Sequence, residues 1–171
     1  MLFRSGFYLD TETYLRGLAQ NHPLIMHNQP VSNTDATLRY SFFRINNLEE
    51  LNAATRTLIH DTCMVWVSFD GKDLNKGGSI KQLNRTMLLF LNILTLDPAD
   101  LNKATAISKC FDTSYSVMQD IKKSIYDAAQ EDPCESPFKN IYPARWEQDG
   151  PIGDNLYGWI LEFEYITKAF T

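Results

Sequence analysis

The stretch Thr62–Leu94, TCMVWVSFDGKDLNKGGSIKQLNRTMLLFLNIL, decides the fold. Within Thr62–Asp70 one face carries Cys63, Val65, Val67 and Phe69, and the other carries Met64, Trp66 and Ser68. These largely β-branched and aromatic residues predict a strand that ends at Asp70-Gly71. A second strand is predicted over Ile80–Leu94. The segment between them, Asp70–Ser79, is polar and rich in turn formers. The two long strands therefore predict a β-hairpin with a projecting polar loop.

A long amphipathic helix is expected after the hairpin. Asp97 and Pro98 suit the N-cap and the first helical position, and the apolar spacing of three and four continues to about Glu131. We expect a kink or break at Asp112-Thr113-Ser114. The predicted apolar face comprises Leu101, Ala104, Ile107, Phe111, Tyr115, Met118, Ile121, Ile125 and Ala128.

The C-terminal strand has the clearest alternation in the chain. Within Leu156–Thr167, one face carries Tyr157, Trp159, Leu161, Phe163 and Tyr165, and the other carries Gly158, Ile160, Glu162 and Glu164. The polar members predict a sheet that is covered on one side and solvated on the other. Before it, Asp149–Asn155 is dense in turn formers, and the segment from Pro137 to Trp146 reads as a strand or an irregular segment.

The N-terminal third predicts three smaller elements. Asp10 suits the N-cap of a short helix over Thr11–Asn21, and Leu38–Asn46 is a plausible strand. Asn47 and Glu50 resemble a capping box before a short helix through Leu51 and Ala54. With the later elements, the order predicts one α+β domain over residues 1–171, a mostly antiparallel sheet with a long β-hairpin packed against one long amphipathic helix.

Composition excludes several classes of function. The chain has 171 residues, 44% hydrophobic and 22% charged, and a net charge of −5. That acidic balance argues against a nucleic-acid binder and a polybasic membrane protein. Its longest apolar stretch, Met87–Leu96, is about half of what a bilayer requires, roughly 20 residues. We expect synthesis in the cytoplasm, because the first residues do not resemble a signal peptide.

The residues that could carry chemistry lack the required patterns. Gly71-Lys72 precedes Gly77-Gly78-Ser79, the reverse of the order in a phosphate-binding loop. Glu162 and Glu164 share a strand face but are explained by solvation. Cys63 and His60, three apart, point to opposite faces of a strand. The three cysteines and three histidines show no zinc spacing. The sequence therefore predicts no catalytic, cofactor-binding or metal-binding residue.

Self-assembly is the function that the pattern favours. At least four predicted strands have an apolar face, whereas one long helix covers roughly two or three. Oligomer interfaces could bury the remainder, unless the N-terminal third covers the second face of the sheet.

The order of elements resembles the tail terminator and related tail-completion or neck proteins of tailed bacteriophages. The matching parts are Thr11–Asn21, the hairpin Thr62–Leu94 with its Asp70–Ser79 loop, Asp97–Glu131 and Leu156–Thr167. The similarity covers about three quarters of the chain, and it is topological, with no shared motif. The segment Asn28–Asn47 departs from the compact form of that family.

The resemblance implies a structural virion protein without enzymatic activity. Copies would join into a homo-oligomeric ring that connects the tail tube to the connector and docks on other neck or tail proteins. The acidic charge would let DNA pass through the lumen without specific binding. No cofactor and no membrane is implied. The predicted subunit or partner contacts lie on the hairpin loop, at Lys72, Asp73, Asn75 and Lys76.

Two other hypotheses remain open. A small cytosolic α+β enzyme or ligand-binding protein would have its cleft between the long helix and the sheet. A regulatory or adaptor protein would add a strand to a partner at an exposed sheet edge. A closed oligomer favours the ring-forming protein. A monomer with a buried polar pocket near Glu162, Glu164 or His60 favours an enzyme.

Overall fold

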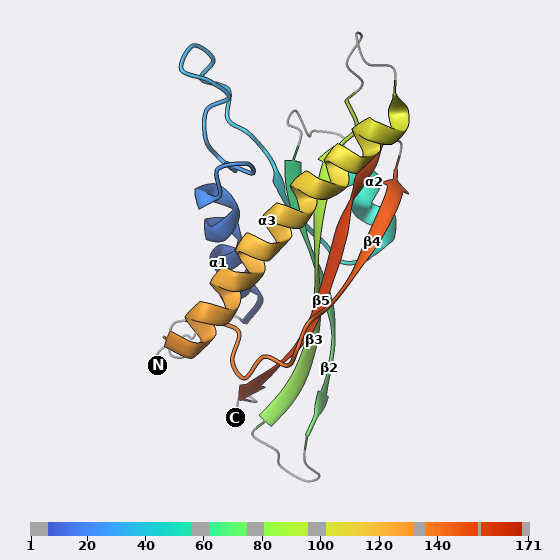
Figure 1. Cartoon of the computed structure of the whole chain (residues 1–171). Coiled ribbons are helices and arrows are strands. Elements are labelled where there is room, and N and C mark those ends of the chain that lie inside the picture. Colours follow the sequence, from blue (N-terminus) through green and yellow to red (C-terminus); the bar gives the residue numbers. More distant parts are fainter. Residues whose placement is uncertain are drawn as a thin grey trace.

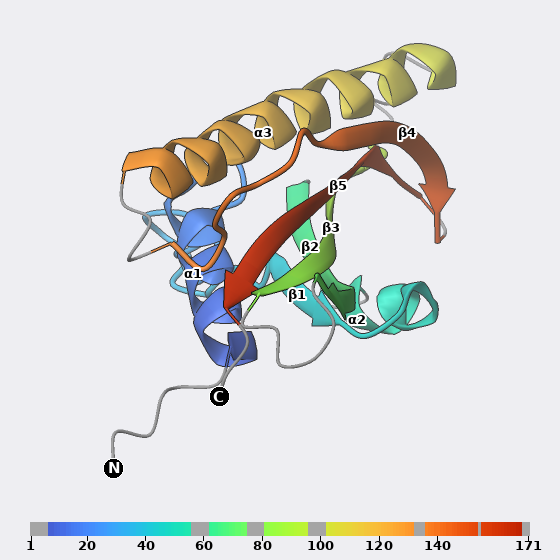
Figure 2. The same ribbon diagram turned by 90° about the horizontal axis from the view of Figure 1, so that it is seen from below.

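A computed structural model describes residues 7–55, 62–74, 81–95, 102–131, 136–153 and 155–168. The fold is α+β, as predicted. Figure 1 shows a twisted sheet with one long helix lying across its face and a shorter N-terminal helix beside it. Seen from below in Figure 2, α2 lies on the side of the sheet away from the long helix.

The sheet has five strands in the order β1-β2-β3-β5-β4. β2 is antiparallel to β3, which is antiparallel to β5, which is antiparallel to β4, and only β1 runs parallel to its neighbour. The predicted hairpin is confirmed as β2 and β3. The strands comprise β1 (Phe42–Ile45), β2 (Thr62–Asp73), β3 (Lys81–Ile93), β4 (Arg145–Ile152) and β5 (Leu156–Lys168).

The first hairpin strand, β2, extends further than the turn signal predicted. Asp70-Gly71 does not end β2, which continues to Asp73 and pairs with Gln82 of β3. The register shifts between Ser68 and Gly71, so a bulge includes Asp70, while Gly71 already pairs with Asn84 and the ladder continues. Because β3 offers hydrogen-bond partners as far as Lys81, pairing outweighs the local preference for a turn. Half of the predicted loop, residues 75–79, lies outside the described part.

The long helix α3 (Lys103–Glu131) begins later than predicted. Asn102 accepts a bond from the Thr105 N–H through Oδ1 (3.2 Å) and caps the helix, and Asp97 lies outside the described residues. The expected break at Asp112–Ser114 is absent, since α3 runs through it. Ser114 is buried there and its hydroxyl donates to the Tyr157 carbonyl (3.4 Å), so the helix keeps a polar residue without a kink.

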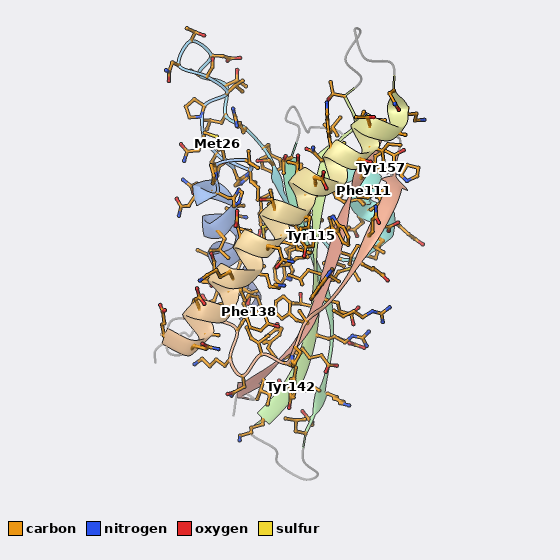
Figure 3. All side chains as sticks on the ribbon, viewed as in Figure 1. Met26, Phe111, Tyr115, Phe138, Tyr142 and Tyr157 are labelled. Atoms are coloured by element: carbon orange, nitrogen blue, oxygen red, sulfur yellow. The ribbon has the colours of Figure 1, made fainter. Side chains whose placement is uncertain are left out.

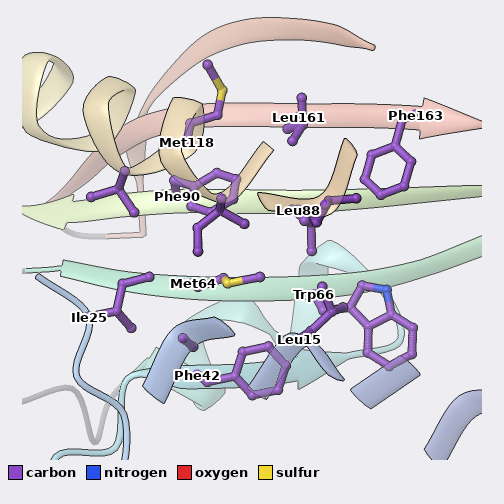
Figure 4. Close-up of a cluster of buried hydrophobic side chains, with 14 of the residues drawn as sticks. Leu15, Ile25, Phe42, Met64, Trp66, Leu88, Phe90, Met118, Leu161 and Phe163 are labelled. Atoms are coloured by element: carbon purple, nitrogen blue, oxygen red, sulfur yellow. The ribbon is translucent and has the colours of Figure 1, made fainter. Parts of the chain in front are cut away.

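One core lies between the sheet and the two longer helices, α1 (Phe7–Asn21) and α3 (Figure 4). Trp66, which is buried in this core, donates through Nε1 to the Thr86 hydroxyl (2.7 Å), which satisfies both buried polar groups. Two details of the predicted helices are wrong. Asp10 lies inside α1 rather than before it, and Tyr115 is 40% exposed while Val117 is fully buried.

A second core covers the opposite face of the sheet. The short helices η1 (Leu48–Glu50) and α2 (Leu51–Thr55) lie against it, and Leu51 is buried in the same cluster as Val65 and Leu89. The Asn47 side chain accepts from the Glu49 N–H (3.0 Å) as expected of a cap. The Glu50 carboxylate, however, accepts from Asn46 rather than closing a capping box on Asn47.

The second core removes one premise of the assembly hypothesis. Apolar strand faces that seemed too many for one helix are covered by the N-terminal third of the same chain. The cluster lies on the face away from α3 and comprises Phe43, Ile45, Leu51, Cys63, Val65, Val67, Met87, Leu89, Leu91, Leu156 and Ile160. Any case for self-association must therefore rest on surfaces that remain exposed.

Two strand predictions need correction. The region Asp149–Asn155, expected to be a turn, contributes its first residues to β4, which starts at Arg145 and pairs with β5. The sequence of β4 does not alternate between apolar and polar residues, because both faces of this strand are exposed along almost its whole length. In the N-terminal third, only Phe42–Ile45 of the predicted strand Leu38–Asn46 pairs with β2.

Gly158 offers a test of the β3–β5 contact. A Cβ there would lie 1.8 Å from the Phe90 carbonyl oxygen and 2.9 Å from Leu91 Cα, both backbone atoms. We expect Gly158→Ala to lower the free energy of unfolding by at least about 3 kcal/mol in urea denaturation, because the central strands must separate. Gly17→Ala is the matched control. Nothing lies within 4 Å of its new Cβ, so it should stabilise α1 by up to about 1 kcal/mol. Equal midpoints for the two variants would contradict the register.

Candidate interaction surfaces

The hairpin residues predicted to contact partners lie only partly in a loop. Lys72 and Asp73 belong to β2, both exposed, while Asn75 and Lys76 lie outside the described residues. Asp73 accepts a bond from Gln82 Nε2 (3.2 Å). A small hollow of about 120 Å³ next to Lys72 has side chains of both charges on its walls. The role of these four residues in partner binding stays a prediction.

The residues weighed for catalysis have structural explanations where the structure describes them. Glu162 accepts from Arg85 Nε (3.0 Å) across the sheet, as expected of a solvated face with cross-strand ion pairs. Burial raises the pKa of the Cys63 thiol to about 12, so this thiol is not ionised at neutral pH. His60 lies outside the described residues. Within the described ranges, His, Cys, Asp and Glu form no cluster of three that could hold a metal.

A hairpin-like finger, residues 28–40, leads from the end of α1 towards β1. Its two arms are joined by backbone bonds from Asn28 N to Arg39 O (2.8 Å) and from Val31 N to Thr37 O (2.9 Å). Arg39 turns back along the finger and donates to the Val31 carbonyl (2.8 Å). Figure 1 shows the finger reaching beyond α1, away from the sheet. The finger is therefore an ordered arm held by its own hydrogen bonds.

The root of the finger is held by His27, which is 1% exposed. Its Nδ1 accepts from the Ser41 N–H (3.2 Å) and the Phe42 N–H (3.1 Å), the residues that open β1. The imidazole also packs edge-on against Tyr40, with 5.3 Å between ring centroids. Burial, and then the positive charge of Arg16, lower the pKa of His27 below its usual 6.5. Neutral His27 thus fastens both the finger and the edge strand.

An open groove of about 560 Å³ lies between α3 and the chain entering β4. We call it the α3–β4 groove. One wall is the last turns of α3, and the other is the segment that ends in Trp146. Lys122 places its ammonium 4.3 Å from the centre of the Trp146 ring, a cation–π contact. Its lining residues are Lys122, Lys123, Tyr126, Asp127, Gln130, Ile141, Pro143, Ala144 and Trp146.

Hydrogen bonds fix the shape of the α3–β4 groove. Tyr126 donates its hydroxyl to the Tyr142 carbonyl (2.7 Å), which ties the incoming segment to the helix. The Tyr142 N–H in turn donates to the Glu164 carbonyl of β5 (2.9 Å). Figure 3 shows Tyr115 and Tyr142 at different heights along α3 and the incoming chain. The groove is therefore preformed rather than a gap that side chains could close.

Exposed large apolar side chains lie on both surfaces. The finger carries Leu38 and Tyr40, and Leu24 lies just before its root. The groove carries Trp146, whereas Tyr142 lies on the incoming segment beside the lining residues and Tyr115 lies earlier on α3 against Trp159. The finger runs into β1 and the groove is bounded by β4, the two edges of the sheet. The molecule thus carries two different exposed surfaces, one on the finger that leads into β1 and one between the last turns of α3 and the chain entering β4.

The two edges of the sheet are poorly suited to adding a strand from another chain. At β1, His27 occupies the Phe42 N–H and Glu50 occupies the Asn46 N–H. At β4, the Asp149 carboxylate takes the Gly150 N–H (2.8 Å), and Pro151 has no N–H to donate. Charged residues and irregular pairing on an edge strand discourage edge-to-edge association. Side-chain surfaces are therefore better candidates for contacts than the sheet edges.

Comparison with known proteins finds no protein family whose model matches this chain and no significant match among curated proteins. In the described part of the chain, each helix is too short or too polar to span a bilayer. The finger and the groove were missed by sequence reasoning, although Pro30 and the run Ser32–Asp35 signalled a turn.

His27 predicts a pH dependence of stability. Its pKa is lower in the folded chain than in the unfolded chain, so the unfolded chain binds the proton more readily. The stability is complete above the unfolded pKa of about 6.5 and decreases as the pH falls below it, by up to about 1.4 kcal/mol per pH unit. Urea denaturation at a series of pH values measures this slope.

His27→Asn is the matched variant for that measurement. Asparagine keeps an acceptor oxygen close to the position of Nδ1 but does not titrate. The difference in unfolding free energy between pH 7.5 and pH 5.5 should therefore be smaller in His27→Asn than in the original chain. Identical differences in the two proteins would show that His27 is not held neutral in the folded state.

Proposed function

We propose that this protein is a structural subunit whose copies associate head to tail into a closed ring, as at the neck or tail top of tailed bacteriophages. The single observation that carries the proposal is the presence of two unlike exposed surfaces, the finger that leads into β1 and the groove between α3 and the chain entering β4. Contacts between unlike surfaces are heterologous, and they produce a ring whenever the rotation between neighbours closes.

The order of elements also supports this proposal. The described chain contains an N-terminal helix, a long hairpin, a helix packed on the sheet and a closing strand pair. This order resembles tail terminator and tail-completion proteins, whose subunits form rings. In the proposed role the ring joins the tail tube to the connector in the virion, and Lys72 and Asp73 contact a neighbouring component. The net charge of −5 favours passage of DNA without binding.

A ligand-binding or enzymatic role is the second candidate, because the α3–β4 groove is large enough for a small molecule. The groove is open, however, and the groups in it that could transfer a proton are already engaged. Lys123 is paired with Asp127, and the Tyr126 hydroxyl is held by a backbone carbonyl, while burial raises its pKa. An adaptor that adds a strand to its partner is disfavoured by the occupied edges.

Absolute mass in solution tests the proposal. Size-exclusion chromatography with light scattering, over a hundredfold range of concentration, should give a discrete oligomer, and negative-stain images should show rings. A monomer throughout this range would contradict self-assembly and favour the ligand-binding role. The readout is independent of any activity.

Exposed apolar residues should differ in their effect on this mass. Trp146→Ser removes an aromatic anchor from the groove, and we expect at least a tenfold weaker association, or about 1.4 kcal/mol. Leu9→Ser is the matched control. Leu9 is the most exposed of the large apolar side chains described, at 62%, but it lies on neither surface. Equal loss of association in both variants would indicate nonspecific apolar contacts instead of an interface at the groove.

A further inference from the structure

We propose that the finger of one copy docks in the α3–β4 groove of the next copy. This inference rests on the proposed function, because it needs self-association, and it names the two surfaces that meet. The occupant of the groove is therefore a second copy of this chain, and the contact is apolar with one charge pair.

The finger has the properties of an arm built for another molecule. Between residues 28 and 40, only Gln29, Val31 and Arg39 are partly covered, and the other side chains are exposed. Ordering a 13-residue segment costs conformational entropy of about 1–2 kcal/mol per residue. Its own hydrogen bonds offset part of that cost and leave most of its side chains available for contact with another molecule.

Charge complementarity selects the groove as the receptor. Asp35 is the one carboxylate of the finger, and it is fully exposed near the tip. The only cation of the finger, Arg39, is turned back onto Val31 and Met26. Within the described ranges, Lys123 of the groove is paired with Asp127, but no carboxylate is paired with Lys122. The tip therefore presents one negative charge, and the groove presents one positive charge.

The apolar contacts have matching spacing. Leu38 follows Asp35 by three residues, about 10 Å of extended chain. From Lys122 to Gln130 along α3 is about 12 Å. With Asp35 at the Lys122 ammonium, Leu38 reaches the apolar part of the groove near Tyr126 and Ile141. Leu38 is 56% exposed in the free chain, and Pro30 lies opposite to it across the finger. Docking would bury this pair.

The finger cannot fill the groove of its own chain. Its root is fixed to the beginning of β1 by the two bonds to His27, while the groove is lined by the last turns of α3 and the chain entering β4. In Figure 1 the finger extends upwards from α1, whereas the last turns of α3 lie at the lower end of that helix. The arm also points away from the sheet in Figure 1. The contact must therefore be between copies, which gives the heterologous geometry that a ring requires.

Photo-crosslinking of the full chain tests the contact directly. A benzophenone amino acid replaces Leu38, and equal amounts of 14N- and 15N-labelled protein are mixed before illumination. We expect mixed-label crosslinks from position 38 to residues 122–130 or 141–146, mapped by mass spectrometry. Crosslinks between copies that map elsewhere would overturn the finger-in-groove contact while leaving the ring proposal intact. A protein that stays monomeric and gives no mixed-label product would overturn both.

Charge reversal supplies an independent test. Asp35→Lys and Lys122→Glu should each weaken association about tenfold, because each places like charges together, and the double variant should recover most of the loss. Lys109→Glu is the control for Lys122→Glu, since Lys109 lies exposed on the same helix but outside the groove. Additive losses in the double variant would refute the pairing of Asp35 with Lys122. Circular dichroism confirms that each variant is folded.

Discussion

The position of β3 at the centre of the sheet is the constraint on which the other elements depend. It pairs along its length with β2 on one side and with β5 on the other. Its residues Met87–Leu91 are buried in unbroken succession, so both faces of the sheet must be covered. α3 with α1 covers one face, and the short helix α2 covers the other. The two edge strands and the helices all pack against this three-stranded centre.

The elements that sequence reasoning predicted well have periodic patterns that tertiary packing reinforces. β2, β3 and β5 alternate, and α3 repeats every three to four residues, since each has a side that must be buried. β4 could not be predicted because both of its faces are wet, so RWEQDG carries no alternation. The start of α3 was misplaced for a different reason. Asp97-Pro98 and Asn102 are both acceptable starts, and local signals do not choose between them.

The candidate surfaces could not be predicted because they arise from contacts far apart in the sequence. Tyr115 reads as a core residue by spacing alone, but the rotation of α3 on the sheet buries Ser114 and Val117 instead and leaves Tyr115 at the margin. The groove needs α3 to lie beside a segment some 20 residues later, held there by Tyr126. The finger needs a histidine whose partners are two backbone amides 14 and 15 residues further along the chain.

The two edges of the sheet share a property that matters for assembly. Each edge has its backbone donors partly occupied, which lowers the risk of open-ended strand addition. Next to each closed edge, however, the chain exposes large apolar side chains, on the finger at β1 and in the groove at β4. Side-chain docking of this kind has one defined geometry, whereas strand pairing can continue or slip in register. A subunit that must stop at a closed ring benefits from the first mode, because closure requires the same rotation at every contact.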